Sequence, residues 1–281
     1  MKSGNILITG ISTGIGRATA IYLANNGFNV WGTVRNEKDF NAISSLNIET
    51  LHPTILDVTS AKDIAKLKNK LGDMPLVGLI NNAGIAITGP LKYLQIEKLK
   101  KQFEVNVFGL FRVTQAFIPN LELYHELSGD DGRIINISSV SGRMVTPFNV
   151  SYAASKFAVE ALSDGFRREL THNGIKVTLI EPGPIKTEIW NKALREDTSD
   201  FANEYATLIG KRTEYVRKTM ESALSVDYVT RAIYDAIIDE DPPIRKIITK
   251  NAEIFNLVLK MPDRLIDYIS KMKLKLPEFR L

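Results

Sequence analysis

Short apolar runs alternate with longer amphipathic stretches along most of the chain. The apolar runs predict strands over 6–8, 29–34, 49–56, 76–80, 133–137, 176–180 and 245–249. The stretches between them predict helices from Ile15 onward and over 38–46, 61–71, 96–127, 152–171 and 226–238. Strands joined by helices of this length imply right-handed crossovers and a parallel sheet. We therefore expect an α/β protein with a doubly wound sheet, which binds its ligands at the carboxyl ends of the strands.

Three features interrupt this alternation. Pro119 is expected to bend or break the helix over 96–127. Residues 184–224 are polar-rich with scattered apolar positions, and this pattern predicts a helical lid over the substrate. Residues 250–281 are predicted to be an amphipathic C-terminal extension, with helical spacing of its apolar residues from Val258 to Leu276. All of these parts are expected to belong to one domain, residues 1–281.

Composition is that of an ordinary soluble protein. The chain has 281 residues, of which 44% are hydrophobic and 24% charged, enough for one open α/β domain. It contains no cysteine, which excludes disulfides, thiol nucleophiles and cysteine-based zinc sites. We expect no metal site, because no H-E-x-x-H pair is present. The first predicted strand follows Met1 closely and no apolar run has the length of a membrane span, so a cytoplasmic location is expected.

The net charge of +4 lies mainly at the C-terminal end. Residues 260–281 hold six basic residues against three acidic ones. This uneven distribution argues against a nucleic-acid surface, which would require a basic face within a recognisable binding motif. A basic amphipathic helix is compatible with peripheral contact with a membrane. A lid or a dimer-packing helix with a solvated charged face explains the same pattern, and both alternatives stay open.

A glycine-rich turn follows the first predicted strand. Gly10 permits a tight turn, Gly14 allows close approach of a pyrophosphate, and Gly16 allows the helix to pack on the sheet. The spacing is G-x-x-x-G-x-G, which differs from the G-x-G-x-x-G of many dinucleotide sites. On its own, the turn is equally compatible with an ordinary strand-to-helix connection.

The candidate catalytic residues lie shortly before and after residue 150. Tyr152 and Lys156 are four residues apart and share a face of a predicted helix, while Ser139 follows a predicted strand. A lysine ammonium about 5.5 Å away would lower the pKa of a tyrosine by roughly two units, at an effective dielectric constant of about 20. We therefore predict Tyr152 as a general acid/base, with Ser139 bound to the substrate oxygen.

The residues that end the second strand bear on cofactor choice. An NAD-specific site places an acidic residue there to accept from the ribose hydroxyl, but this chain has Val34 and Arg35. The Arg35 guanidinium suits a 2′-phosphate, which predicts NADP(H) in preference to NAD(H). The alternative is that Arg35 is a solvated loop charge.

Apolar residues surround the candidate chemistry and predict an apolar ketone or alcohol as substrate. They are Met144, Val145, Pro147, Phe148, Val150, Ile189 and Trp190.

As an ordered set over residues 5–188, these motifs resemble the short-chain dehydrogenase/reductase family, whose members have a Rossmann fold. The resemblance implies a catalytic set of Asn106, Ser139, Tyr152 and Lys156. It implies cofactor contacts from Gly10, Ser12, Thr13, Gly14, Ile15, Gly16, Arg35, Asp57, Val58, Asn82, Ala83, Gly84, Tyr152, Lys156, Pro182, Gly183 and Thr187. Taken singly, Asp57 and Asn82 could equally be turn residues and Thr187 a helix cap.

The function implied by the resemblance is hydride transfer between NADP(H) and a carbonyl or alcohol, in a homodimer or homotetramer formed through residues 96–127 and 152–171. Two other classes share these features. A cofactor-sensing regulator would usually lack the tyrosine or the lysine, and both are present. A sugar epimerase or dehydratase typically has a different glycine spacing and a larger C-terminal domain. Oxidation of NADPH across a panel of carbonyl compounds would separate the three.

Overall fold

The computed structural model describes residues 3–187, 210, 213–214 and 216–274 of the chain. Its centre is a seven-stranded parallel sheet with the order β3-β2-β1-β4-β5-β6-β7, which confirms the predicted α/β fold class. The strands are β1 (Gly4–Ile8), β2 (Phe28–Val34), β3 (Leu51–Ile55), β4 (Leu76–Asn81), β5 (Gly132–Ile137), β6 (Ile175–Pro182) and β7 (Arg245–Ile248). The strand order reverses between β1 and β4, and ligands of doubly wound sheets bind at such a switch point.

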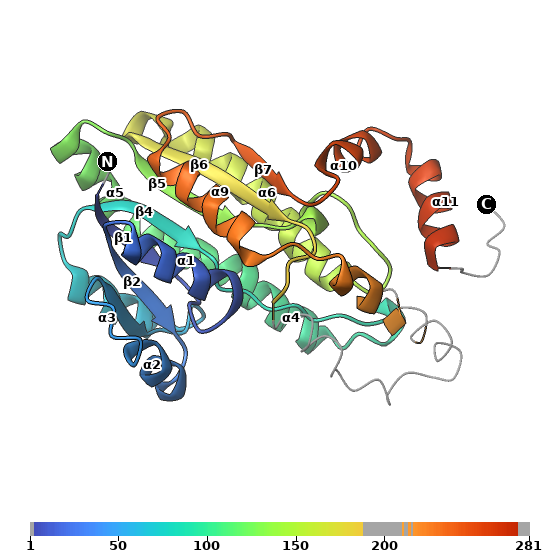
Figure 1. Ribbon diagram of the computed structural model, residues 1–281, viewed down its shortest axis with the longest axis horizontal. Coiled ribbons are helices and arrows are strands. Elements are labelled where there is room, and N and C mark those ends of the chain that lie inside the picture. Colours follow the sequence, from blue (N-terminus) through green and yellow to red (C-terminus); the bar gives the residue numbers. More distant parts are fainter. Residues whose placement is uncertain (1–2, 188–209, 211–212, 215, 275–281) are drawn as a thin grey trace.

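Helices cover both faces of the sheet (Figure 1). They are α1 (Gly14–Asn25), α2 (Glu37–Ser44), α3 (Ala61–Leu71), α4 (Ile96–Phe103), α5 (Leu110–Ser128), α6 (Val150–Leu170), α9 (Val226–Ile238), α10 (Ala252–Val258) and α11 (Asp263–Leu274). Alternate side chains of β1 enter two separate cores. Ile6 and Ile8 pack in the core with residues of α1 and α9, and Leu7 packs with residues of α3, α5 and α6. A sheet buried on both faces explains why its strands are continuous apolar runs.

Of the bend or break predicted at Pro119, the break is wrong. Helix α5 continues through this residue, which is exposed together with Gln115 one turn earlier. Because water can reach the carbonyl that proline leaves without a donor, the helix tolerates it. The helical geometry changes instead at Glu104–Gly109, a π-helical segment between α4 and α5.

The C-terminal extension also differs from the single helix expected. It contains two helices, α10 and α11, which are separated just before Asp263 by Pro262. Proline restricts the preceding residue to extended backbone and so ends a helix. Figure 1 shows both helices beyond the end of β7, away from the sheet. No helix in the described ranges is both long and apolar enough to cross a membrane.

Part of the predicted lid lies outside the described residues, including Ile189 and Trp190. Within the described part, residues 216–221 are helical and a parallel bridge joins Ile185 to Leu224. This bridge connects the end of the predicted lid to the segment that follows β6.

Candidate active site

The turn between β1 and α1 depends on three glycines, through backbone conformation or close packing. Gly10 and Gly14 have left-handed φ angles of 74° and 59°. A Cβ atom on Gly16 would lie 2.2 Å from the main-chain oxygen of Gly10 and 2.3 Å from Nδ2 of Asn82. Glycine is therefore required for α1 to start this close to the end of β1.

The start of α1 fits a phosphate group. Its N-cap, Thr13, makes no side-chain hydrogen bond to the helix, and the first turn contains no acidic residue. The first N–H groups of a helix lack intrahelical partners and carry partial positive charge, which favours an anion. Ser12 and Ile15, which the resemblance assigns to the cofactor, lie in the same stretch.

Hydrogen bonds tie this turn to the end of β4. Oγ1 of Thr9 accepts from the main-chain nitrogens of Asn82 and Ala83, at 3.1 and 3.0 Å. Nδ2 of Asn82 donates to the main-chain oxygens of Thr9 and Gly10, both at 2.9 Å. Thus Asn82 shapes the glycine turn and is more than a local turn residue, and Gly84 follows at the same edge. The sequence analysis missed Thr9.

The segment after β6 approaches the same turn. Pro182 ends β6, Gly183 follows it, and the side chain of Thr187 lies 3.4 Å from the position of a Cβ on Gly14. A cavity of about 630 Å³ opens beside this contact and is lined by Gly14, Arg17, Ala18, Ile21, Lys186, Thr187, Met220 and Val226. Gly14 and Thr187, which belong to the predicted cofactor set and are far apart in sequence, therefore lie next to each other.

Two predicted cofactor contacts lie at the ends of β2 and β3. Arg35 directly follows β2, is exposed, and makes no hydrogen bond or ion pair with any residue that the structure describes. Asp57 follows β3, and its Oδ1 accepts from the nitrogen and Oγ1 of Thr59, at 2.9 and 2.8 Å. Asp57 thus holds a turn, while Val58 is buried against Gly109.

Ser139, Tyr152 and Lys156 come together where β5 and β6 end. Oγ of Ser139 donates to the main-chain oxygen of Pro182 at 3.3 Å. Nζ of Lys156 donates to the main-chain oxygen of Ile137 at 2.7 Å and lies 5.7 Å from the centre of the Tyr152 ring. The helix α6 and the strand β5 thus place the three side chains at one edge of the sheet, as their spacing predicted.

The predicted lowering of the Tyr152 pKa is wrong for the chain by itself. Burial raises the pKa of Tyr152 to about 12, and this outweighs a side-chain hydrogen bond with Ser139 that lowers it. Burial also lowers the pKa of Lys156 to about 8, against an opposing effect of the Glu160 charge. Desolvation is therefore the largest effect on both groups, and spacing along one helix face cannot reveal it.

Asn106 lies in the π-helical segment and is almost completely buried. Its Nδ2 donates to the main-chain oxygen of Ile85 and to Oγ of Ser155, both at 3.0 Å, and its Oδ1 accepts from the nitrogen of Ile85 at 2.9 Å. Oγ of Ser155 donates in turn to the main-chain oxygen of Tyr152 at 2.7 Å. Asn106 is therefore connected to the helix that carries Tyr152. π-Helical turns are frequent at functional sites.

Sequence reasoning missed Gln102, which lies one turn before Asn106. Its side chain is buried, accepts from the nitrogen of Ile87 at 2.7 Å and donates to the main-chain oxygen of Ile85 at 2.6 Å. The four-residue spacing to Asn106 was the available signal.

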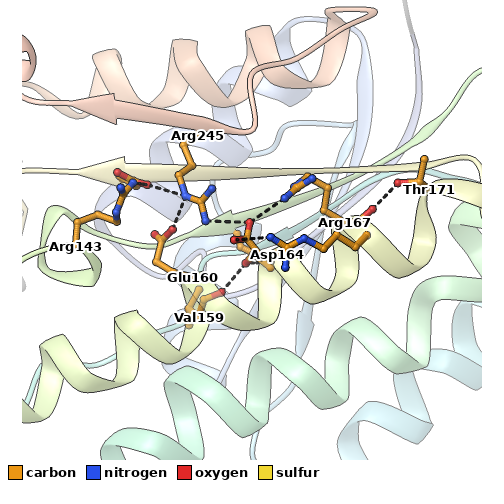
Figure 2. A network of polar contacts seen from close by, with 11 residues as sticks. Arg143, Val159, Glu160, Asp164, Arg167, Thr171 and Arg245 are labelled. Atoms are coloured by element: carbon orange, nitrogen blue, oxygen red, sulfur yellow. Dashed lines mark hydrogen bonds and ion pairs between the residues drawn. The ribbon is translucent and has the colours of Figure 1, made fainter. Parts of the chain in front are cut away.

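A charged network behind the site was also missed. Figure 2 shows Arg245 of β7 reaching to Glu160 and Asp164 of α6, with Arg143 nearby. Arg143 and Arg245 both contact the buried carboxylate of Glu181, at 3.2 and 3.5 Å. Residues this far apart in sequence carry no local pattern that predicts the contact.

The predicted substrate-facing residues lie between Ser139 and α6. Phe148 is buried and has a left-handed φ of 66°, which is rare for a bulky residue, and Val145 is 43% exposed. Met144 and Pro147 are partly buried, as is Val150 at the start of α6. The segment between Ser139 and α6 therefore carries several apolar side chains beside the exposed Arg143.

Comparison with known proteins gives a consistent result. The family model described as short chain dehydrogenase matches residues 4–198. The NADPH-dependent 3-dehydrocapnine reductase of Ornithobacterium rhinotracheale is 34% identical over 274 residues, covering 96% of each chain. Human retinol dehydrogenase 16 is 31% identical over 288 residues, covering 96% of this chain and 88% of the relative. The crystal structure of a short-chain dehydrogenase from Streptomyces avermitilis has a TM-score of 0.77 at 26% identity, over 97% of this chain and 95% of that one.

Proposed function

This chain belongs to the short-chain dehydrogenase/reductase family of oxidoreductases, and from that premise we propose that it transfers a hydride between NADP(H) and a carbonyl or alcohol group, with Tyr152 as general acid/base. The observation that carries the proposal is the meeting of Ser139, Tyr152 and Lys156 at the sheet edge that also holds the glycine turn. The bound nicotinamide would supply or accept the hydride.

The side chains divide the remaining work. The Ser139 hydroxyl orients the substrate oxygen beside Tyr152. A Tyr152 pKa of about 12 keeps the phenol protonated at neutral pH, which suits a proton donor to a carbonyl undergoing reduction. Lys156, with a pKa of about 8, is mostly an ammonium ion at that pH and stabilises the phenolate left behind. Asn106 holds Ile85 and Ser155, and thereby the helix start that carries Tyr152.

The preference for NADP(H) is proposed from Arg35. Its guanidinium is exposed directly after β2, and Val34 offers no acceptor for a ribose hydroxyl. The 34% identical reductase from Ornithobacterium rhinotracheale carries NADPH dependence in its name.

The substrate class proposed is apolar. Met144, Val145 and Phe148 lie in the segment between Ser139 and Tyr152, and apolar side chains close to a reacting group favour an apolar substrate. One relative named above is a retinol dehydrogenase, which supports a bulky apolar substrate.

The experiment is an NADPH oxidation assay over apolar ketones, aldehydes, small keto acids and nucleotide sugars, with the reverse reaction on the corresponding alcohols. Turnover favouring bulky apolar carbonyls supports the proposal. NADPH binding without turnover would instead identify a cofactor sensor, and activity confined to nucleotide sugars would identify an epimerase or dehydratase.

A peripheral membrane contact through α10 and α11 is proposed as well. Five large apolar side chains are exposed there, namely Ile254, Leu257, Leu265, Tyr268 and Met272. On α11, at 100° per residue, Arg264 and Lys271 border this apolar face, whereas Asp263 and Asp267 lie on the far side. The protein should sediment with vesicles that contain anionic lipid, and substitution of Leu265 and Met272 by glutamate should abolish this binding. If the double variant Leu265→Glu/Met272→Glu still sediments with the vesicles but no longer self-associates, α11 is a dimer interface instead.

Self-association is proposed through the helices around α4, α5 and α6. Ile96, Phe108 and Phe157 are large apolar residues and are 53, 49 and 43% exposed. Analytical ultracentrifugation should show a dimer or tetramer, and Phe108→Glu/Phe157→Glu should shift it toward monomer.

A further inference from the structure

A buried carboxylate lies one helical turn beyond Lys156. Glu160 follows Lys156 by four residues on α6, so both side chains point from the same face of the helix. Glu160 is 7% exposed and Lys156 6%. The ammonium group donates to Ile137, and among the described residues no ion pair joins it to Glu160. The two charges therefore interact through the protein interior, where screening by water is weak.

Two elements hold Glu160 in place. Nε of Arg245 donates to Oε2 of Glu160 at 2.9 Å, while Nη2 of Arg245 lies 2.9 Å from Oδ1 of Asp164. Figure 2 shows this clamp between β7 and α6. On another side, a Cβ on Gly142 would lie 3.2 Å from Cγ of Glu160 and 3.1 Å from the main-chain oxygen of Lys156. Gly142 belongs to the short turn that begins at Ser139, so Glu160 packs directly behind the candidate catalytic residues.

A second carboxylate shares the same arginine. Glu181 is fully buried on β6, next to Pro182, whose oxygen accepts from Ser139. Nη1 of Arg143 donates to its Oε1 at 3.2 Å, and Nε of Arg245 lies 3.5 Å away. Burial, and then the charge of Glu160, raise the pKa of Glu181 to about 7. Near neutral pH Glu181 is therefore only partly ionised, as expected for a buried acid beside another carboxylate.

We propose that Glu160 is a positioning residue of this site, whose buried negative charge keeps Lys156 in the ammonium form and which Arg245 fixes behind the catalytic residues. The inference rests on the proposed function, in which Lys156 acts as a cation. The titratable and charged groups on the elements that pack around Lys156 and Glu160 are Tyr152 and Asp164 of α6, Glu181 of β6, Arg245 of β7, and Arg143 after the Ser139 turn. Burial already lowers the pKa of Lys156 to about 8, and Glu160 is the named charge that opposes this effect.

The first test is the pH profile of turnover in Glu160→Gln. For charged groups four residues apart on a helix, taken as roughly 6–10 Å from each other, removing one charge lowers a lysine pKa by about 1–2 units at an effective dielectric constant of about 20. The alkaline limb of the profile should therefore move to lower pH by about 1 unit or more. Glu160→Asp keeps the charge, so the alkaline limb of its pH profile should lie close to that of the wild type. Glu169→Gln removes an exposed carboxylate from the same helix and is the matched control.

The second test does not depend on activity. In protein labelled with ¹³C-lysine, the ε-carbon signal of Lys156 is assigned by its loss in Lys156→Met, and its titration midpoint is compared between wild type and Glu160→Gln. A lower midpoint in Glu160→Gln supports the proposal whether or not the wild type is active. If the wild type reduces no carbonyl compound in the panel, that result contradicts only the proposed function. An unchanged midpoint in the folded variant overturns the proposal about Glu160.

Folding of the variant is expected, because Arg245 retains Asp164 and Glu181 as partners after the substitution. Glu160→Met, which is similar in size and uncharged, is the second neutral variant. If circular dichroism shows that neither neutral variant folds, Glu160 is needed for folding itself and the proposal is overturned.

Discussion

The ammonium group of Lys156 lies 5.7 Å from the centre of the Tyr152 ring and is held there by the main-chain oxygen of Ile137. The cation is thus fixed by the end of β5 and does not depend on the tyrosine for its position. Because burial raises the pKa of Tyr152 to about 12, the two residues form a protonated phenol beside a cation at neutral pH.

Tyr152→Phe tests the role of the phenol. The variant should bind NADPH nearly as wild type does, since only the hydroxyl is lost, and its turnover should fall by roughly 10²- to 10⁴-fold. Fluorescence titration of NADPH and steady-state kinetics measure the two effects. Near-normal turnover in the folded variant would remove Tyr152 from the mechanism.

Arg35→Ala tests cofactor choice. A charge-assisted hydrogen bond contributes about 1.5–3 kcal/mol, so NADPH affinity should fall roughly 10- to 150-fold, with little change for NADH. Adding Val34→Asp should turn preference toward NADH through repulsion of the 2′-phosphate. Arg168→Ala, an exposed arginine of α6, is the control. Equal loss of both cofactors in Arg35→Ala would contradict the assignment.

Gly16→Ala tests the close packing of the glycine turn. The new Cβ would clash with the main-chain oxygen of Gly10 and with Asn82, so we expect loss of stability and of NADPH binding. Gly165→Ala in α6 is the matched control, since nothing lies within 4 Å of its Cβ position. Alanine there should stabilise the helix by up to about 1 kcal/mol. Chemical denaturation gives both values, and equal stabilities for the two variants would refute the packing argument.

Glu181 should make stability depend on pH. Its pKa is about 7 in the folded protein and 4.5 in the reference state, so between these values the folded protein binds more protons and Glu181 makes stability fall as pH rises. The stability of Glu181→Gln relative to wild type should therefore increase from pH 4.5 to 7 and then level off. Glu240→Gln, at an exposed position, controls for the loss of one charge. A constant difference between Glu181→Gln and wild type across this range would contradict the prediction.

The sequence by itself determined the sheet, its crossovers and the edge at which ligands bind, because strand periodicity and glycine spacing are local properties. It also located Ser139, Tyr152, Lys156 and Arg35 at strand ends or on one helix face. Those positions follow from spacing alone, and the structure places them accordingly.

Only the tertiary structure decided how these groups are charged and what surrounds them. Glu160, Glu181 and Arg245 meet because α6, β6 and β7 are adjacent in the sheet and its covering layer, a contact that no sequence interval encodes. The pKa of Tyr152 depends on how completely neighbouring elements exclude water, and that effect is opposite in sign to the lysine effect expected from spacing. Pro119 lies inside the continuous helix α5, whereas Pro262 lies between α10 and α11, although both prolines are exposed. The charge state of Tyr152 therefore follows from burial, which is a property of the assembled fold.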